Sequence, residues 1–443
     1  MTERLTVPLL TGNPGGGKSH TMRDDMIERP GLCVFALPTI DLLREQERKL
    51  RRAAPNLRLF AAHSNRAGRK QVQLQVNKHL AAISEQGITR CVLLITHDFL
   101  ESGDLTGLTG WRFYIDEPPI AIRAGKLTIT RSSLKLWKSQ FALSPIETWG
   151  QLRRVDDTPL RLGLERGDTM LKDLASLRRA AAGRSVVLLS TDKWKIGTHN
   201  WMTIWTPLDL PSTEVTMAGA GYLRSLGAKV AMKLHSDQLV FQEQEVTRPR
   251  SGQPQVTLHY FADWECSSPH WHTWDGLGDL AAIADHVRTQ SPDLGYWSGN
   301  AIAKVAMSHR ISVTQPSKAR LAGRDDMMAL QSCAFIYSSK ASAHLKPILS
   351  LLRLTQEEVR QSAEDEDIFQ FVFRGAIRRP EFDGRYPIYL FSKQQADRLK
   401  SMLHASGLDD VSLEFEGAAG VSLQPPQQGR RPILVSNEQD DDA

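Results

Sequence analysis

The segment Gly12-Asn-Pro-Gly-Gly-Gly-Lys-Ser19 is a complete G-x-x-x-x-G-K-[ST] sequence. It follows the apolar stretch 5–11 and precedes residues 20–28, so the expected order is strand, glycine-rich loop and helix. In that context the glycines let backbone N–H groups surround phosphates, and the helix N-terminus adds partial positive charge. Lys18 is expected to reach the β- and γ-phosphates of a nucleotide, and the Ser19 hydroxyl to bind Mg²⁺. The predicted nucleotide-binding residues of this loop are Gly12, Asn13, Pro14, Gly15, Gly16, Gly17, Lys18 and Ser19.

A second segment supplies the acidic groups that phosphate chemistry needs. Residues 111–115 (Trp-Arg-Phe-Tyr-Ile) are largely apolar and are followed by Asp116 and Glu117. Asp116 is predicted to hold Mg²⁺ through water, and Glu117 to orient and polarise the attacking water. In isolation this pattern also fits a strand followed by a solvated acidic turn. Its place about 100 residues after the phosphate-binding loop, among alternating strands and helices, favours the catalytic interpretation.

Composition sets the broad class of the chain. Its 443 residues, 41% of them hydrophobic, leave room for two or three domains with real cores. The four cysteines show neither a disulfide framework nor zinc-ligand spacing, which favours a reducing cytoplasm. Cys266, His270 and His272 are close in sequence, but a structural zinc site needs a fourth ligand. No run approaches the roughly 18 apolar residues of a membrane span, and a first strand from about Leu5 leaves no room for a signal peptide.

The net charge of +5 is unevenly distributed. Residues 121–200 contain 15 Lys or Arg against 7 Asp or Glu, a net +8, whereas residues 436–443 contain four acids and no base. A basic body favours a polyanionic partner, and the acidic tip offers a surface for a protein partner. The tract also contains Trp137, Trp149 and Trp194, which either stack on bases or pack in a core.

Short apolar runs alternate with helical patterns through the chain. Residues 32–37, 90–96 and 185–189 are strand-like, and residues 40–52 form an amphipathic helical pattern. This alternation predicts a parallel sheet covered by helices on both faces. Residues 120–183 are predicted to form a mostly helical, basic insertion, and 247–255 a linker. A second β/α region includes strands at 256–261 and 332–337 and a helix at 280–289, and residues 417–443 are predicted to be disordered.

On these motifs and their order, residues 5–405 resemble superfamily 2 helicases, the DEAD/DEAH-like translocases with two RecA-like domains. The resemblance implies a domain at 1–245 that binds ATP and Mg²⁺, a second RecA-like domain at 246–416 and a tail at 417–443. Pro38-Thr39 is similar to motif Ia, and Thr96-His97 to the threonine-containing segment upstream of motif II. Both imply contacts with nucleic acid. Pro118-Pro119 replace the usual residues after Asp116-Glu117, so no named subfamily applies.

The remaining motifs are assigned by the same resemblance. Two segments are similar to motif III, 215–220 and 188–191, of which the first is preferred because it lies just before the interdomain stretch. Residues 322–325 resemble motif V, which implies that Gly323 faces nucleic acid and that Asp325 lines the nucleotide site. Residues 370–378 resemble motif VI, although Phe373 replaces a glycine and the arginine spacing is four instead of three. On a helix that spacing keeps the two arginines on one face. The implied nucleotide and finger residues are Gln370, Arg374 and Arg378.

Two functions from different classes follow from these observations. The first is a nucleic-acid-dependent ATPase, a helicase or translocase that hydrolyses ATP between its RecA-like domains and binds single-stranded or forked nucleic acid, with DNA favoured over RNA. Lys18, Glu117, Arg374 and Arg378 are its predicted catalytic residues. The second is an ATP-gated nucleic-acid-binding, packaging or assembly motor that does not unwind a duplex. We expect no membrane partner.

Overall fold

The structure, a computed structural model, describes residues 5–64, 69–118, 122–146, 149–155, 177–178, 181, 186–197, 199–205, 210, 214–234, 239–265, 268–311, 327–338, 349 and 352–421. The chain divides into two compact units. The first contains the described residues of 1–12, 17–246 and 341–359, and the second those of 13–16, 247–340 and 360–443. Each described helix is too short or too polar to cross a lipid bilayer.

The first unit is built on a seven-stranded sheet in which all neighbouring strands are parallel. Its strand order is β12-β1-β11-β5-β2-β4-β3. Nearly every residue of the central strands is buried, which explains why they are continuous apolar runs. The strands are β1 (Leu5–Thr11), β2 (Leu32–Leu37), β3 (Arg58–Ala62), β4 (Cys91–Thr96), β5 (Arg112–Asp116), β11 (Val215–Ala218) and β12 (Leu239–Glu245).

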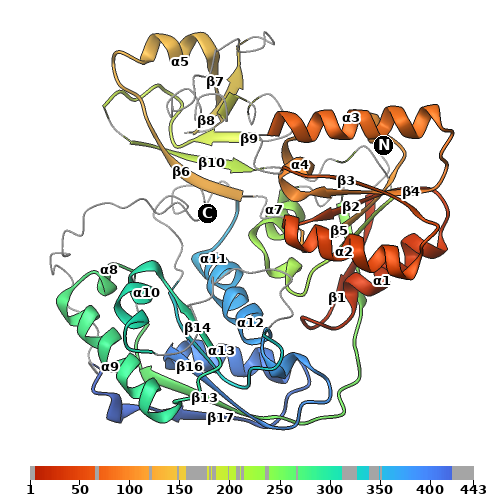
Figure 1. Cartoon of the computed structure of the whole chain (residues 1–443). Helices are drawn as coiled ribbons and strands as arrows, with labels where there is room; N and C mark the ends of the chain where they lie inside the picture. The colour runs from red at the N-terminus through yellow and green to blue at the C-terminus, as the bar shows by residue number, and fades with distance from the viewer. Residues whose placement is uncertain are drawn as a thin grey trace. The chain divides into compact units, whose positions relative to one another are not determined.

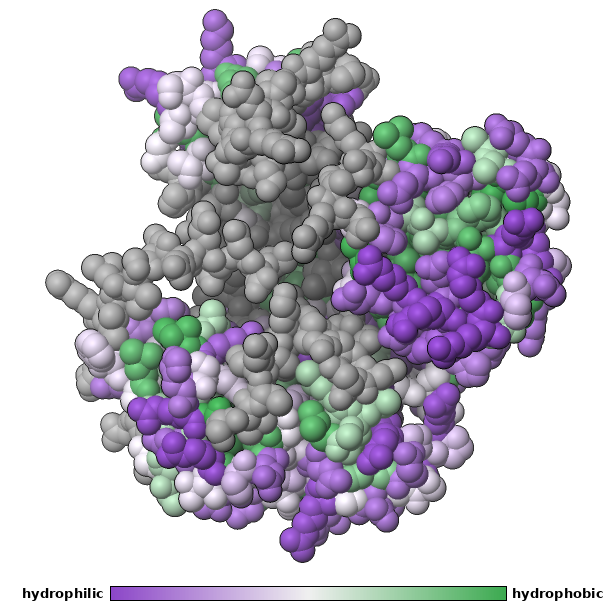
Figure 2. All heavy atoms as spheres, in the orientation of Figure 1, coloured by the Kyte–Doolittle hydropathy of each residue, from purple (hydrophilic) through white to green (hydrophobic). Residues whose placement is uncertain are grey.

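Helices cover both faces of this sheet (Figure 1). Because side chains alternate along a strand, Cys33 and Phe35 of β2 pack on one side, against α1 and α2, while Val34 packs on the other. Figure 2 shows hydrophilic residues gathered over the region of α1 and α2, whose outer surface is exposed. The helices are α1 (Lys18–Glu28) and α2 (Ile40–Ala53) on the first face, and α3 (Arg69–Glu85), α4 (His97–Ser102) and α7 (Leu226–Leu234) on the second.

The inserted region differs from the predicted helical insertion. Its described part forms a five-stranded sheet of order β6-β10-β9-β8-β7, with antiparallel neighbours, together with the short helix α5 and helical residues at 177–178 and 181. The prediction of a mostly helical segment at 120–183 is therefore wrong for the described residues, where strands predominate. The elements are β6 (Ile122–Thr128), α5 (Leu134–Gln140), β7 (Phe141–Ile146), β8 (Trp149–Arg154), β9 (Val186–Leu189) and β10 (His199–Trp205).

A segment from late in the chain belongs to the first unit. Four apolar residues of this segment pack against Trp149 of β8 and Val230 of α7. Lys233 of α7 adds a salt bridge to Glu358 at 2.7 Å and donates a hydrogen bond to the Arg353 carbonyl, also at 2.7 Å. The core of the first unit therefore includes residues that a division at 245 leaves out. The four packed residues are Leu349, Leu352, Leu354 and Val359.

The second unit contains a five-stranded parallel sheet of order β14-β15-β16-β13-β17. Helices α9 and α10 pack on one face, and α12 and α13 on the other. The strands are β13 (Gln255–Ala262), β14 (Tyr296–Gly299), β15 (Cys333–Ile336), β16 (Arg385–Ser392) and β17 (Val411–Phe415). Its helices are α8 (Ser268–Trp271), α9 (Trp274–Gln290), α10 (Ala301–Ser308), α12 (Glu366–Val372) and α13 (Lys393–His404), whereas α11 (Gln356–Arg360) belongs, except for Arg360, to the late segment of the first unit. The predicted fold class, with parallel-sheet α/β domains in tandem, is confirmed.

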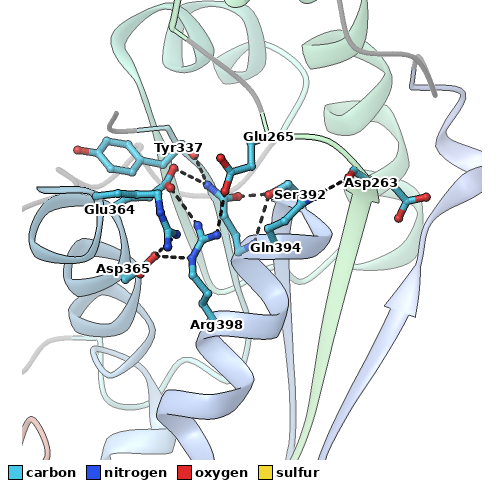
Figure 3. A network of polar contacts seen from close by, with 10 residues as sticks. Asp263, Glu265, Tyr337, Glu364, Asp365, Ser392, Gln394 and Arg398 are labelled. Carbon is cyan, nitrogen blue, oxygen red and sulfur yellow. Dashed lines mark hydrogen bonds and ion pairs between the residues drawn. The ribbon is translucent and has the colours of Figure 1, made fainter. Parts of the chain in front are cut away.

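A polar network within the second unit holds α13 against the turn that precedes α12 (Figure 3). Arg398 donates to Glu265 at 2.9 Å, to Glu364 at 3.1 Å and to Asp365 at 2.8 Å. Gln395 donates a further bond to Glu364 at 2.8 Å. Because Glu364 is only 3% exposed, these donors compensate a buried carboxylate that would otherwise be costly.

Candidate functional site

The glycine-rich loop connects β1 to α1, as predicted. Gly12 has a φ of +117°, and a Cβ there would lie 2.4 Å from the Val246 carbonyl oxygen, so only glycine fits. Gly17, also left-handed with a φ of 103°, caps α1. Lys18, the first residue of that helix, is 9% exposed and donates a hydrogen bond from Nζ to the Gly12 carbonyl at 2.8 Å. The Lys18 amine therefore points toward the backbone of the loop.

Ser19 and Asp116 meet although 97 residues separate them in sequence. The Ser19 hydroxyl donates to Asp116 Oδ2 at 2.6 Å. Asp116 is the last residue of β5 and is 4% exposed. Burial raises the pKa of its carboxyl, while the Ser19 hydrogen bond and the charges of Lys18 and Arg23 oppose that rise. Two oxygen groups, suited to a hard cation such as Mg²⁺, therefore lie side by side.

Strand β11 links the loop to the acidic segment. It lies between β1 and β5 in the sheet. Beyond its end, the Gly219 N–H donates to the Leu10 carbonyl at 3.1 Å, and the Ala218 carbonyl accepts the Glu117 N–H at 2.7 Å. Glu117 is exposed and adopts a left-handed φ of 50°. Ser190, in contrast, follows β9 in the antiparallel sheet, so placement favours 215–220 as the counterpart of motif III.

The two segments predicted to contact nucleic acid come together at one edge of the sheet. β2 and β4 are parallel neighbours, with Leu37 opposite Thr96, so Pro38 and Thr39 leave the sheet beside Thr96 and His97. The Thr39 hydroxyl caps α2 by accepting the Leu42 N–H at 3.2 Å. These residues therefore share the end of the sheet at which Asp116 lies.

His97 is buried beside the acidic segment. The nearby backbone of Asp116 and Ala36 favours the charged ring, although Nε2 is buried with no hydrogen-bond partner among the described residues. Burial lowers its pKa to about 4, so the ring is neutral at physiological pH. His97 therefore lies beside Asp116, a candidate metal ligand, which the sequence analysis did not predict. Its contact with nucleic acid stays a prediction.

The motif VI residues lie in the second unit. Gln370 in α12 donates to Glu366 at 2.9 Å. Arg374 is 6% exposed, and its guanidinium carbon lies 5.4 Å from the centre of the Phe371 ring. Arg378 ends a 3₁₀ turn at Ala376–Arg378. Since α12 ends at Val372, the prediction that Arg374 and Arg378 share one helical face is wrong.

Two buried tyrosines explain why the helix stops there. The Tyr296 hydroxyl lies 2.9 Å from the Phe371 carbonyl and 3.0 Å from that of Val372, and it accepts the Gly375 N–H at 3.1 Å. The Tyr386 hydroxyl donates to the Val372 carbonyl at 3.1 Å. These partners satisfy helix-terminal groups that a continuing helix would have bonded internally.

Some predicted residues lie outside the part of the chain that the structure describes. They include Gly323 and Asp325 of the motif V resemblance, Pro119, and the predicted disordered tail from 422 onward. Their roles stay predictions. Sequence reasoning missed His97 as a neighbour of Asp116, and it missed the bonds from β11 to both loops. The position of His97 beside Asp116 could have been inferred from the apolar run that ends at Thr96. That run predicts a parallel strand, and parallel strands of one sheet place the residues that follow them at the same edge.

The fold and this geometry define a class, a tandem parallel-sheet α/β protein with a phosphate-loop sequence between β1 and α1. No protein-family profile matches the chain, and neither does any curated protein sequence. Among solved structures, the chain is similar to one described as "XPD_APO", with a TM-score of 0.53 and 11% identity, over 92% of this chain and 97% of that one.

Two further solved structures are similar at lower scores. "XPD_Helicase" has a TM-score of 0.49 and 11% identity, over 93% of this chain and 96% of that one. Xpd4 of S. tokodaii has a TM-score of 0.48 and 12% identity, over 92% and 96%. The similarity to "XPD_APO" is one of fold, over nearly the full length of both chains.

Proposed function

We propose that the protein is a nucleic-acid-dependent ATPase that acts as a helicase or translocase. The observation that carries this proposal is the 2.6 Å hydrogen bond between Ser19 and Asp116, which unites the phosphate-loop sequence with the acidic end of β5. The helicase-like fold supports it, because tandem parallel-sheet units are the architecture of such ATPases. Fold alone does not fix activity, so the proposal depends on the chemistry of these residues.

ATP and Mg²⁺ fit the residues of the glycine-rich loop and the acidic end of β5. Ser19 and Asp116 are oxygen ligands, and Asp116 is buried where a cation would compensate its charge. Mg²⁺ held there would neutralise charge on the transferred phosphoryl group. Lys18 would exchange its bond to the Gly12 carbonyl for the β- and γ-phosphates, with the loop from Gly12 to Ser19 supplying backbone N–H groups.

Hydrolysis is assigned to a small set of side chains. Glu117, exposed beside Asp116, would orient the attacking water and accept its proton. Arg374 and Arg378 would stabilise charge on the γ-phosphate in the transition state, a role that requires the two units to close on the nucleotide during turnover. Gln370 and Asp325 are proposed to contact the nucleotide from the second unit.

Nucleic acid is the proposed partner. Pro38, Thr39, Thr96 and His97 end neighbouring strands of one sheet, and together with Gly323 they are proposed to contact a single strand or a fork, with DNA preferred. The net charge of +8 over 121–200 supports attraction of a polyanion. The acidic tail is proposed to bind a protein partner.

ATP hydrolysis tests the catalytic part of the proposal. E117Q is expected to retain ATP while losing turnover, because Asp116 and Ser19 remain for the metal; K18A is expected to lose nucleotide binding. The matched control is E214Q, which removes an exposed acid at the opposite end of β11. Wild-type turnover by E117Q, measured with nucleotide affinity on the same sample, contradicts the assignment of Glu117.

Polymer dependence tests the remaining part. Single-stranded DNA or RNA is expected to raise the ATPase rate, with an affinity that falls steeply as salt increases because counterions are released. Strand displacement on a forked duplex separates a helicase from the alternative assembly motor. An ATPase rate indifferent to both polymers, without salt-dependent binding, excludes the proposed nucleic-acid partner.

A further inference from the structure

Four titratable side chains gather in the second unit, on the face of its sheet that α9 covers. His259 of β13 lies opposite Glu414 of β17 in the parallel register. Glu416 follows two residues later and continues the pairing, since its N–H donates to the Tyr260 carbonyl at 2.8 Å. Because residues two apart on a strand share a face, all three side chains project to the same side. His286 approaches them from α9.

One carboxylate in this group binds both imidazoles. Glu416 Oε1 lies 2.6 Å from His259 Nδ1, and Glu416 Oε2 lies 2.6 Å from His286 Nε2. Glu414 Oε2 is 3.8 Å from the same Nδ1 of His259. The side chains of His259 and Glu416 are each 13% exposed, and that of Glu414 is 63% exposed. The group is therefore partly buried, and the Glu414 carboxylate lies at the surface.

Aromatic contacts fix the orientation of both rings. His259 stacks on Tyr389 with ring centroids 4.5 Å apart, and Tyr389 is itself hydrogen-bonded to Ser291 at 2.8 Å. His286 meets Phe261 edge to face, with centroids 5.8 Å apart. The two imidazoles consequently present defined nitrogens toward Glu416, an arrangement that a site for a directional ligand requires.

We propose that His259, Glu414 and Glu416 bind a divalent transition-metal ion of the Zn²⁺ type, with His286 as a positioning residue. One ligand atom from each of the three lies within 4.8 Å of the others. An imidazole nitrogen and two carboxylate oxygens, each about 2.0–2.2 Å from the ion, form a three-ligand site with a position left for water. His286 holds the second oxygen of Glu416, as hydrogen-bonded outer residues do for metal ligands.

The metal has a structural consequence for the edge of the sheet. β17 is an edge strand of this sheet: among the described strands it pairs with β13 alone. Metal bound by Glu414, Glu416 and His259 links this edge strand to β13, and His286 extends the link to α9. We therefore expect occupancy to stabilise the second unit, independently of nucleotide hydrolysis.

Metal binding is measured on the full chain after treatment with a chelator. Zn²⁺ is titrated in competition with a chromophoric chelator, in excess Mg²⁺ to saturate the Ser19–Asp116 region, and Co²⁺ serves as the spectroscopic probe. The wild type is expected to bind one ion at this site, with ligand-field bands for Co²⁺ and a higher melting temperature. H259Q and E414Q should lose that binding, and H286Q should weaken it by roughly tenfold or more.

The control is H404Q. His404 also lies near a carboxylate, with Nδ1 4.0 Å from Asp409 Oδ1, but it is not part of the proposed site. H404Q should bind as the wild type does. E414Q keeps the test interpretable if H259Q fails to fold, because Glu414 is largely exposed. Equal affinity and equal Co²⁺ spectra in the wild type, H259Q and E414Q overturn the site, as does a folded wild type that binds no Zn²⁺.

Discussion

Protonation of His97 is expected to weaken the first unit as the pH falls below about 6.5. The ring is 7% exposed, and burial lowers its pKa from 6.5 to about 4 although the nearby backbone of Asp116 and Ala36 favours the charged form. The folded chain therefore holds a neutral ring under conditions in which the unfolded chain protonates it. The resulting stabilisation is fully present above the unfolded pKa and is lost as the pH falls through the window from 6.5 to about 4.

The size of the effect follows from this pKa difference. Lowering the pKa from 6.5 to about 4 is equivalent to about 3 kcal/mol between the two protonation states. Near pH 5 the unfolded histidine is almost fully protonated, whereas about a tenth of the folded population is, so roughly 2 kcal/mol of stability is lost relative to neutral pH. Since the side chain is buried, solvent screening reduces this value little.

Local stability is read from hydrogen exchange in increasing urea, followed by mass spectrometry of peptides that span β4 and β5. Between neutral pH and about pH 5, the wild type should lose about 2 kcal/mol more than H97Q, and H404Q should behave as the wild type does. An imidazole NMR titration of the wild type provides a second measurement that needs no variant. The role of His97 is refuted if H97Q loses as much stability as the wild type between neutral pH and about pH 5, or if the His97 signal titrates near 6.5.

Three further outcomes are expected. S19A removes the hydroxyl bonded to Asp116 and should cost about 1–3 kcal/mol while weakening Mg²⁺-dependent nucleotide binding, measured by melting and by Mg²⁺ titration; unchanged values contradict it. R374A and R378A should each lower kcat about a hundredfold or more with little change in nucleotide affinity, and lysine should not rescue either; near-normal turnover removes the finger assignment. Y296F should destabilise the second unit by about 1–3 kcal/mol, because the Phe371 and Val372 carbonyls lose a buried donor and the Gly375 N–H loses its shorter bond; urea unfolding at the wild-type midpoint contradicts it.

The parts of the fold that were predictable are those whose signals are local. The glycine pattern at 12–19 and the apolar runs of β2, β4 and β5 are continuous in sequence, and each maps to one element. The pairing of Ser19 with Asp116 was also predictable, because the roles of the two residues imply a shared metal.

The parts that were missed depend on distant partners. The antiparallel sheet joins β6 to β10 and β7 to β8, and the basic sequence of β6 lacks the apolar alternation of a half-buried strand. Pro145 lies in β7, an edge strand, where its missing N–H is tolerated although it reduces the strand signal. The end of α12 depends on Tyr296, 76 residues before Val372, so no local sequence pattern predicts it.

The late segment packed into the first unit constrains how the protein is made. A ribosome synthesises Trp149 and Val230 long before Leu352 and Val359, which cover them. Until then the nascent first unit exposes apolar side chains, the kind of surface that chaperones bind and that promotes aggregation. A fragment ending at 246 should share this defect permanently, and supplying residues 341–359 as a separate peptide should relieve it. The chain therefore completes its first domain only after about half of its second has been translated.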